Sequence, residues 1–200
     1  MPDLETQDAP ASDSPLVPRA RDGDRAACRE LYRRHSNGIF TLACRMTGDR
    51  AEAEDLTQEV FIHAFRGLCG FRGESSFSTW LYRIAINHCR SRLRQRRPGA
   101  LVPIDQADVG TEPQRATDLR LLLERAVGQL PEGYREVFVL HDVQGMGHGE
   151  IAEILGCSAG TVRSQLWKAR GRLREMIGPH LKGEGYEVPG LGQEAAEPAG

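Results

Sequence analysis

The sequence lacks any run of about 18 uncharged apolar residues, the length that a helix needs to cross a membrane. Its first 18 residues also lack the basic stretch and the apolar stretch of a secretory signal peptide. They carry acidic residues instead (Asp3, Glu5, Asp8 and Asp13). We therefore expect a protein that stays in the cytoplasm and has no membrane partner.

Sites for metals and cofactors are not indicated either. Five cysteines lie far apart, with no CxxC pair and no zinc-like Cys/His spacing: Cys28, Cys44, Cys69, Cys89 and Cys157. We interpret them as reduced, mostly buried small hydrophobic residues. The six histidines show no ligand spacing, and the chain has no Gly-rich phosphate loop and no carboxylate cluster. The sequence thus predicts no cofactor, no metal and no enzymatic activity.

The distribution of charge is more informative than the net charge of -2. Eight of the 28 acidic residues lie in two end segments, 1–16 and 183–200, which contain no basic residue. The rest of the chain holds 26 basic and 20 acidic residues. Such a basic body favours a polyanionic partner, although ordinary solvated surfaces also carry charge.

The spacing of apolar residues predicts an all-α fold, because they recur at three and four positions rather than at two. Segments at both ends and in the middle are too polar, or too rich in Pro and Gly, to bury a core. We therefore expect two small helical domains joined by a flexible linker and flanked by disordered acidic tails. The predicted segments are a tail (1–18), the first domain (19–97), the linker (98–116), the second domain (117–178) and a tail (179–200).

Turn and capping residues divide the first domain into helices. The first helix covers about residues 24–46. Asp49 caps the next helix, with Glu52 three residues on completing a capping-box pattern. A Gly-rich loop over residues 67–76 then leads to a helix over about residues 77–97.

This last helix of the first domain carries a one-sided row of cations. Spacings of four and three place five residues on one stripe: Arg83, Asn87, Arg90, Arg94 and Arg97. Residues 77–97 contain six arginines and no acid, which is unfavourable for a merely solvated face. Trp80, with Phe71 and Phe77 that look exposed, could stack with unpaired bases, although Trp80 and Phe77 could instead belong to the core. We interpret the helix as a nucleic-acid contact.

The end of the second domain has the outline of a helix-turn-helix. A short helix over about residues 148–155 precedes a Gly156-Cys157-Ser158 turn and a basic helix over about residues 159–177. The N-terminal residues of such a second helix contact base edges in the major groove, which nominates Ser158, Thr161, Arg163, Ser164 and Lys168. Ser158 is also expected to cap the helix, and this outline occurs as a purely structural motif too.

An acidic surface is predicted on the second helix of the first domain. Asp55, Gln58 and Glu59, with Glu52 one turn earlier, lie on adjoining polar faces. An acidic surface on a basic protein does not suit DNA. It fits either a basic protein partner or an ordinary solvated face.

Four motifs in this order resemble the sigma-70 family of bacterial transcription initiation factors, in particular its extracytoplasmic-function (ECF) group. The likeness covers about residues 19–97 and 117–178. Residues 54–61 are similar to the helix that binds core RNA polymerase, and residues 77–87 to the helix that melts and holds the minus-ten element. Three further segments are similar to the part of the family that recognises the minus-thirty-five element: Leu130-Pro131, residues 150–152 and residues 160–164.

The resemblance implies that the first domain is sigma region 2 and the second is sigma region 4. Polymerase contacts, to the coiled-coil clamp of the largest subunit, would come from Asp55, Gln58, Glu59 and Phe61. The loop over residues 70–76 would help to capture a flipped-out base, and the minus-ten contacts would be Phe71, Trp80, Arg83, Asn87, Arg90 and Arg94. The minus-thirty-five contacts would be Ser158, Thr161, Arg163, Ser164, Trp167 and Lys168. Besides the polymerase core and promoter DNA, an anti-sigma factor is implied as a partner.

Two residues depart from the family pattern. Gln165 stands where the family usually has Arg, and Trp167 where a smaller or polar residue is common. The promoter preference of relatives is therefore not transferable. An alternative is a helix-turn-helix regulator that binds duplex DNA without core polymerase, but it leaves the arginine stripe without a role. The acidic C-terminal tail is expected to be either a regulatory segment or a disordered segment without a specific role.

Overall fold

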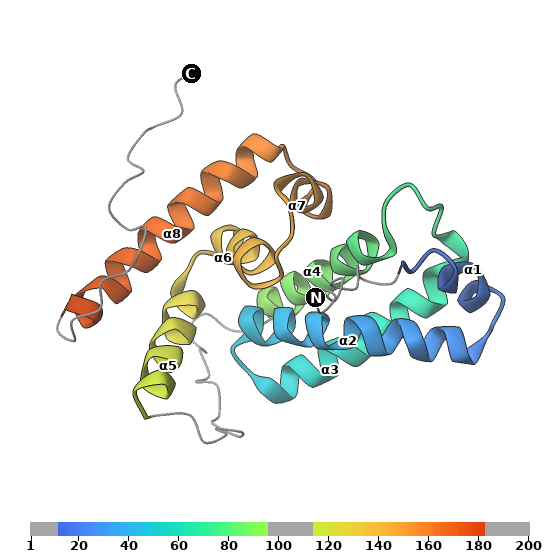
Figure 1. Cartoon of the computed structure of the whole chain (residues 1–200), viewed down its shortest axis with the longest axis horizontal. Helices are drawn as coiled ribbons and strands as arrows, with labels where there is room; N and C mark the ends of the chain where they lie inside the picture. Colours follow the sequence, from blue (N-terminus) through green and yellow to red (C-terminus); the bar gives the residue numbers. More distant parts are fainter. Residues whose placement is uncertain (1–11, 96–113, 183–200) are drawn as a thin grey trace, which may run out of the picture.

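The computed structural model describes residues 12–95 and 114–182, and the regular structure within these ranges is helical throughout. Two helical bundles follow one another along the chain (Figure 1). The first domain contains α1 (Leu16–Arg21), α2 (Arg25–Thr47), α3 (Arg50–Gly67) and α4 (Phe77–Gln95). The second domain contains α5 (Gln114–Gln129), α6 (Glu132–Phe138), α7 (His148–Leu155) and α8 (Ala159–Lys182). The predicted all-α class with two small helical domains is confirmed.

Local capping explains the helix boundaries of the first domain. The Asp24 carboxylate accepts hydrogen bonds from the backbone N–H groups at the start of α2, the shorter one at 2.8 Å from Ala26. Gly48 ends α2 with φ 71°, a left-handed conformation that glycine adopts without steric cost. One residue later, Asp49 accepts a hydrogen bond at 3.0 Å from the Glu52 N–H and starts α3. These contacts match the turn that the sequence predicts.

Three predicted boundaries are wrong in detail. Helix α1 lies partly inside the segment predicted as a disordered tail, because Leu16, Val17 and Ala20 bury their side chains in the core. Helix α5 begins before residue 117, and α8 continues through Pro179 to Lys182 instead of ending at Ile177. Leu181 packs against the core there, which favours the extra turn. Most of the predicted linker and the outer parts of both predicted tails lie outside the described residues.

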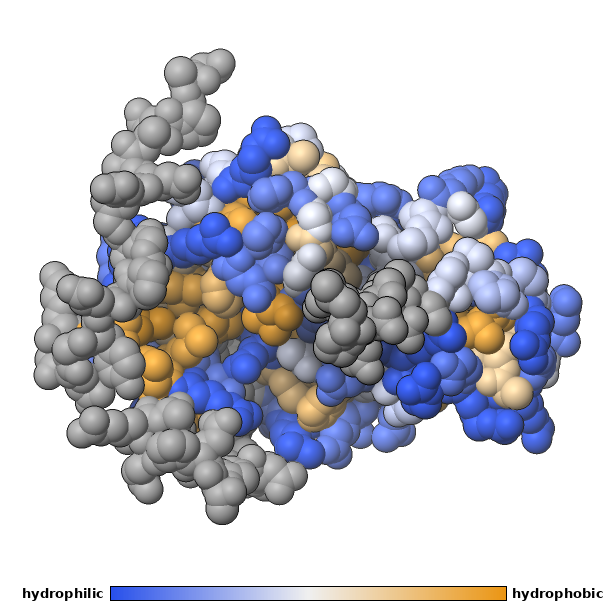
Figure 2. All heavy atoms as spheres, viewed as in Figure 1, coloured by the Kyte–Doolittle hydropathy of each residue, from blue (hydrophilic) through white to orange (hydrophobic). Residues whose placement is uncertain are grey.

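The two domains pack directly against each other. Helix α7 lies over α4, and α5 contacts the end of α2 (Figure 1). An ion pair at 2.9 Å joins Arg45 of α2 to Glu124 of α5. The surface in Figure 2 is mostly hydrophilic, with a hydrophobic area beside α5 and α8. The described parts of the two domains thus share an interface, formed by α4 with α7 and by α2 with α5.

The cysteines are free thiols. Cys89 is buried, three others are half-buried, and Cys69 is exposed, so the prediction of mostly buried cysteines is wrong for Cys69. Burial raises the pKa of Cys89 to about 12 and that of Cys44 to about 11. These two thiols therefore stay protonated at neutral pH and act as apolar packing groups.

Replacing Leu31 tests the packing of the first domain. The Leu31 side chain is fully buried in α2, so Leu31→Ala should lower the free energy of unfolding by about 2–5 kcal/mol. Urea titration followed by circular dichroism measures the change. Ile62→Ala on α3, where the side chain is half exposed, is the control and should change stability by less than about 1 kcal/mol. Equal losses in the two variants would contradict the described core.

Candidate nucleic-acid interface

The turn between α7 and α8 is built by Gly156 and Ser158. Gly156 ends α7 with φ 69°, which residues with a Cβ rarely adopt. Ser158 accepts a hydrogen bond at 3.0 Å from the backbone N–H of Thr161, and its hydroxyl lies 2.9 Å from the Thr161 hydroxyl. The predicted capping role of Ser158 is confirmed. The turn fixes α8 at an angle to α7, as a helix-turn-helix requires.

Helix α8 separates a core face from a basic face. The core face is buried and consists of Val162, Leu166, Ala169, Leu173 and Ile177. Every residue nominated from the N-terminal half of the helix is exposed: Thr161, Arg163, Ser164, Trp167 and Lys168. Trp167 is 64% exposed, which is unusual for the largest side chain in proteins. The nominated side chains on this face are therefore accessible to a partner without any rearrangement of the second domain.

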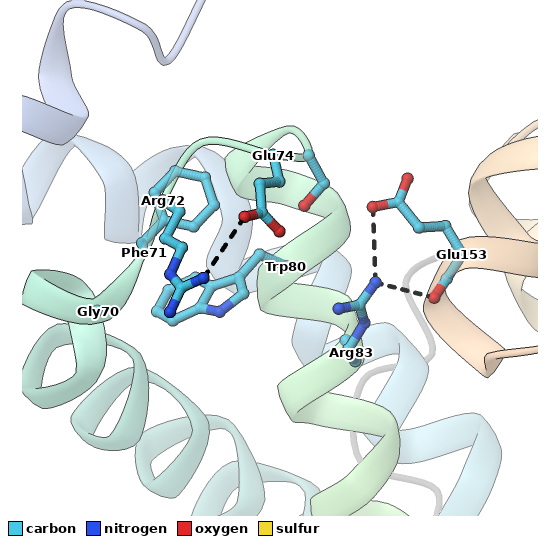
Figure 3. Close-up of a pocket in the computed structure, with 8 residues that line it drawn as sticks. Gly70, Phe71, Arg72, Glu74, Trp80, Arg83 and Glu153 are labelled. Carbon is cyan, nitrogen blue, oxygen red and sulfur yellow. Dashed lines mark hydrogen bonds and ion pairs between the residues drawn. The ribbon is translucent and has the colours of Figure 1, made fainter.

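The loop between α3 and α4 shapes a hollow of about 330 Å³ (Figure 3). Trp80 lines it from α4, and Phe71 and Gly70 line it from the loop. Arg72 and Glu74 form an ion pair at 3.8 Å at its mouth, and Arg83 lies beside it. An aromatic wall with nearby guanidinium groups suits a flat, electron-rich ring linked to a phosphate.

Phe71 and Phe77 are buried, contrary to their predicted exposure. They are 8% and 4% exposed. The two rings meet edge-to-face with centroids 6.2 Å apart, and Phe71 also lies 5.1 Å from the half-buried Trp80 ring. Phe71 thus anchors the loop to the core of the first domain. Among the nominated aromatic residues of the first domain, Trp80 is the least buried.

Two of the nominated arginines on α4 contact the second domain. Arg90 donates two hydrogen bonds to the Glu136 carboxylate of α6, from Nε at 2.6 Å and from Nη2 at 2.7 Å. These bonds raise the pKa of Arg90 above its ordinary value. Arg83 donates to the backbone carbonyl of Glu153 in α7 at 3.0 Å and lies 3.5 Å from its carboxylate. Both guanidinium groups thus have partners within the chain, and their contact with nucleic acid stays a prediction.

The rest of the α4 stripe has a different environment. Asn87 and Arg94 are exposed, and Arg97 lies outside the described residues. Arg92, which the stripe does not include, donates to Glu59 of α3 at 2.8 Å. The helix is therefore only partly covered, and the second domain covers its central positions.

Helix α3 presents the predicted acidic surface. Asp55, Gln58 and Glu59 are exposed, on a helix that packs against α2 and α4 and away from α7 and α8 (Figure 1). Phe61 is different, since it is 3% exposed and its ring lies 4.7 Å from the Tyr32 ring. The nomination of Phe61 as a surface contact is wrong. Phe61 supports the acidic face from below.

Sequence reasoning missed the acidic and amide groups that contact α4. Glu136 is 2% exposed, although it lies on a short helix that also carries Glu132 and Arg135. Charged residues lie close to Glu136 in the sequence, so no local pattern predicts its cationic partner on α4. Gln144 accepts a hydrogen bond from the Tyr82 hydroxyl at 2.8 Å and donates to the Gly38 carbonyl at 3.1 Å. No sequence pattern distinguishes Gln144 from an ordinary loop glutamine.

In the described parts of the chain, no group of three His, Cys, Asp or Glu side chains is placed so that it could hold a metal ion. Nor is any helix in those parts long and apolar enough to cross a membrane.

Comparison with known protein families gives two matches along the chain. Residues 31–98 match the family model "Sigma-70 region 2", and residues 120–173 match "Sigma-70, region 4". The first range contains α3, α4 and the loop between them, and the second contains α7, the turn after it and most of α8.

Individual relatives match over nearly their whole length. RNA polymerase sigma-H factor of Pseudomonas aeruginosa is 35% identical over 191 residues, covering 85% of this chain and 96% of the relative. The ECF RNA polymerase sigma-E factor of Escherichia coli K12 is 33% identical, covering 86% of this chain and 97% of the relative.

A solved structure of CnrH in complex with the cytosolic domain of CnrY matches with a TM-score of 0.68 and 28% identity, over 84% of this chain and 97% of that chain. The sigma factor RpoE in complex with the anti-sigma factor NepR from Bartonella quintana matches with a TM-score of 0.63 and 25% identity, over 75% and 96% of the two chains.

Proposed function

The chain belongs to the sigma-70 family, as an ECF sigma factor that directs bacterial RNA polymerase to promoters, and we propose that three separate surfaces divide this work. The acidic face of α3 binds the polymerase clamp. The hollow beside Trp80 and the basic side of α4 hold the opened minus-ten strand. The exposed face of α8 reads the minus-thirty-five element as duplex.

The duplex assignment rests mainly on the α8 face. The exposed positions from Thr161 to Lys168 combine two cations, two hydroxyls and one large aromatic ring. Cations neutralise phosphates, and hydroxyl and guanidinium groups donate to base edges in the major groove. No acidic residue lies between Thr161 and Arg174 to repel the phosphates.

The single-strand assignment rests on the hollow and the cations around it. A flipped base needs an aromatic surface, and the strand on either side of it needs positive charge. Trp80 supplies the first, and Arg83, Arg90 and Arg94 supply the second along one side of α4. Asn87 adds an exposed amide between them, which can donate to a base or to a phosphate oxygen.

The clamp assignment rests on charge. The polymerase contact has to be distinct from DNA-binding surfaces, and α3 is the acidic surface of a basic body. Asp55 and Gln58 are exposed on it, and the Arg92 contact holds Glu59 beside them. The sigma-70 resemblance of residues 54–61 supports the proposal that this face binds the coiled-coil clamp of the largest subunit.

Partners and location follow from the same role. An anti-sigma factor is proposed as a further partner, because the RpoE relative is solved in complex with one. The chain is proposed to act in the cytoplasm with the polymerase. Catalysis belongs to the polymerase, while this chain supplies promoter recognition and strand opening. A stand-alone helix-turn-helix regulator is not favoured, since the region 2 match covers the whole of α3 and α4.

Charge reversal on α3 tests the clamp assignment. Asp55→Lys should weaken binding to core polymerase by about 2–5 kcal/mol, because it places a cation against a basic partner. Affinity for purified core enzyme is measured by fluorescence anisotropy of the labelled chain, and circular dichroism checks the fold. Glu175→Lys, at an exposed position of α8, makes the same charge change away from α3 and should bind normally. Unchanged affinity of Asp55→Lys would remove the clamp assignment.

Removing one guanidinium tests the α8 face. Arg163→Ala should weaken binding of the holoenzyme to its own promoter by about 1–3 kcal/mol. If Arg163 contacts a phosphate, the slope of log affinity against log salt also falls by about one. Arg174→Ala, nearer the C-terminus of α8, is the control and should have a smaller effect. Normal transcription by Arg163→Ala would mean that the second domain has been misassigned.

A further inference from the structure

Two histidines lie side by side near the basic face of α8, and the proposed duplex contacts include neither of them. His141 belongs to the segment Val139–Val143 that follows α6, and His148 is the first residue of α7. Their ring centroids are 4.9 Å apart, with an angle of 37° between the ring planes. The pair therefore brings two titratable rings together at the helix-turn-helix.

A series of contacts connects this histidine pair to α8. His141 Nδ1 lies 2.7 Å from Oδ1 of Asp142. The Asp142 carboxylate accepts two hydrogen bonds from the Arg170 guanidinium of α8, from Nε at 3.0 Å and from Nη2 at 2.6 Å. Arg170 follows Arg163 by about two turns of α8, so the two cations share one side of the helix. The histidine pair thus flanks the row of cations that is proposed to meet the duplex.

The surroundings of His148 favour its neutral form. Loss of hydration lowers the pKa of His148, and the positive charges of His141, Arg163 and Arg170 lower it further. The Asp142 carboxylate is already engaged by Arg170 and His141. At neutral pH, His148 therefore adds no positive charge to this edge of the duplex surface.

Other charged groups around α7 have partners of their own. The Glu150 carboxylate of α7 accepts a hydrogen bond from the Gly147 N–H at 3.0 Å. From α4, which also packs against α7, Arg83 donates to the Glu153 carbonyl and lies 3.5 Å from its carboxylate. The repulsion between His148 and the α8 arginines therefore prevails.

Duplex DNA reverses this balance. A phosphate that meets Arg163 or Arg170 offsets their repulsion, and it also attracts the charged form of a neighbouring imidazole. We propose that the histidine pair is part of the duplex surface and takes up a proton when promoter DNA binds, with His148 as the group that gains it. This inference rests on the proposed role of the α8 face, and it makes promoter affinity depend on pH.

The direction of the pH effect follows from the linkage between protons and DNA. In the free chain the pKa of His148 lies below its ordinary value, and a bound phosphate raises it. Affinity therefore increases as the pH falls from the bound-state pKa toward the free-state pKa, because only the bound form holds the extra proton there. Each pKa unit between the two states is worth up to about tenfold in affinity.

The test measures binding of the holoenzyme to its own labelled promoter duplex by fluorescence anisotropy, from about pH 8 to about pH 6. His148→Gln keeps a polar side chain but takes up no proton, and His148→Lys carries its charge over the whole range. His180→Gln, at an exposed position near the C-terminal end of α8, is the matched control. Calorimetry in buffers with different ionisation enthalpies counts the protons taken up on binding.

Between these pH limits, the wild type and His180→Gln should gain about threefold to tenfold more affinity than either His148 variant. The deficit of His148→Gln should be largest at the acidic limit, and His148→Lys should bind more tightly than the wild type at the alkaline limit. Proton uptake at neutral pH should be smaller for His148→Gln than for the wild type.

A wild-type gain no larger than that of His148→Gln would overturn the inference, as would equal proton uptake by the two. If His148→Gln fails to fold, as judged by circular dichroism, the comparison with His148→Lys decides. The Arg163→Ala variant keeps the two possible failures apart. Weakened binding by Arg163→Ala, together with equal pH profiles for the wild type and His148→Gln, contradicts only the proton-coupled contact, whereas normal binding by Arg163→Ala contradicts the duplex assignment itself.

Discussion

The ion pair between Arg90 and Glu136 is the contact on which the arrangement of the two domains depends. A carboxylate as buried as Glu136 is costly unless a cation and good hydrogen-bond geometry compensate it, and the Arg90 guanidinium provides both. The pair therefore fixes α6 against the centre of α4. Once α6 is placed, Gln144 reaches Tyr82, and α7 brings Glu153 to Arg83 and to the rim of the hollow.

Helices α3, α4 and α8 each have one face that packs in the core and another that we propose binds a partner. Helix α8 buries Val162 and Leu166 and exposes Arg163 and Trp167. Helix α3 buries Phe61 and exposes Asp55. Helix α4 is the exception, because its basic side already has a partner within the chain. We propose that the acidic face of α3, the exposed basic face of α8 and the covered basic side of α4 serve three kinds of contact: protein, duplex and opened strand.

The sequence was sufficient for the fold and for the free surfaces. Periodicity and caps such as Asp49 and Ser158 are local properties, so they predict helices and turns that the structure confirms. Burial and pairing depend on distant parts of the chain. Phe71 and Phe61 were assigned to surfaces for that reason, and the partners of Arg83 and Arg90 lie about 45 or more residues away. Helix α1 was missed because three apolar residues in a polar segment fold only against an existing core.

The central claim is that this chain gives core polymerase its promoter specificity by combining a duplex reader and a single-strand holder. Run-off transcription with core polymerase over a library of promoter sequences tests it most directly. We expect transcripts only when the chain is present, from promoters that share two sequence elements at one fixed separation, and loss of either element should abolish them. Transcripts that do not depend on the chain would contradict the claim, as would tight duplex binding by the chain alone without any transcript.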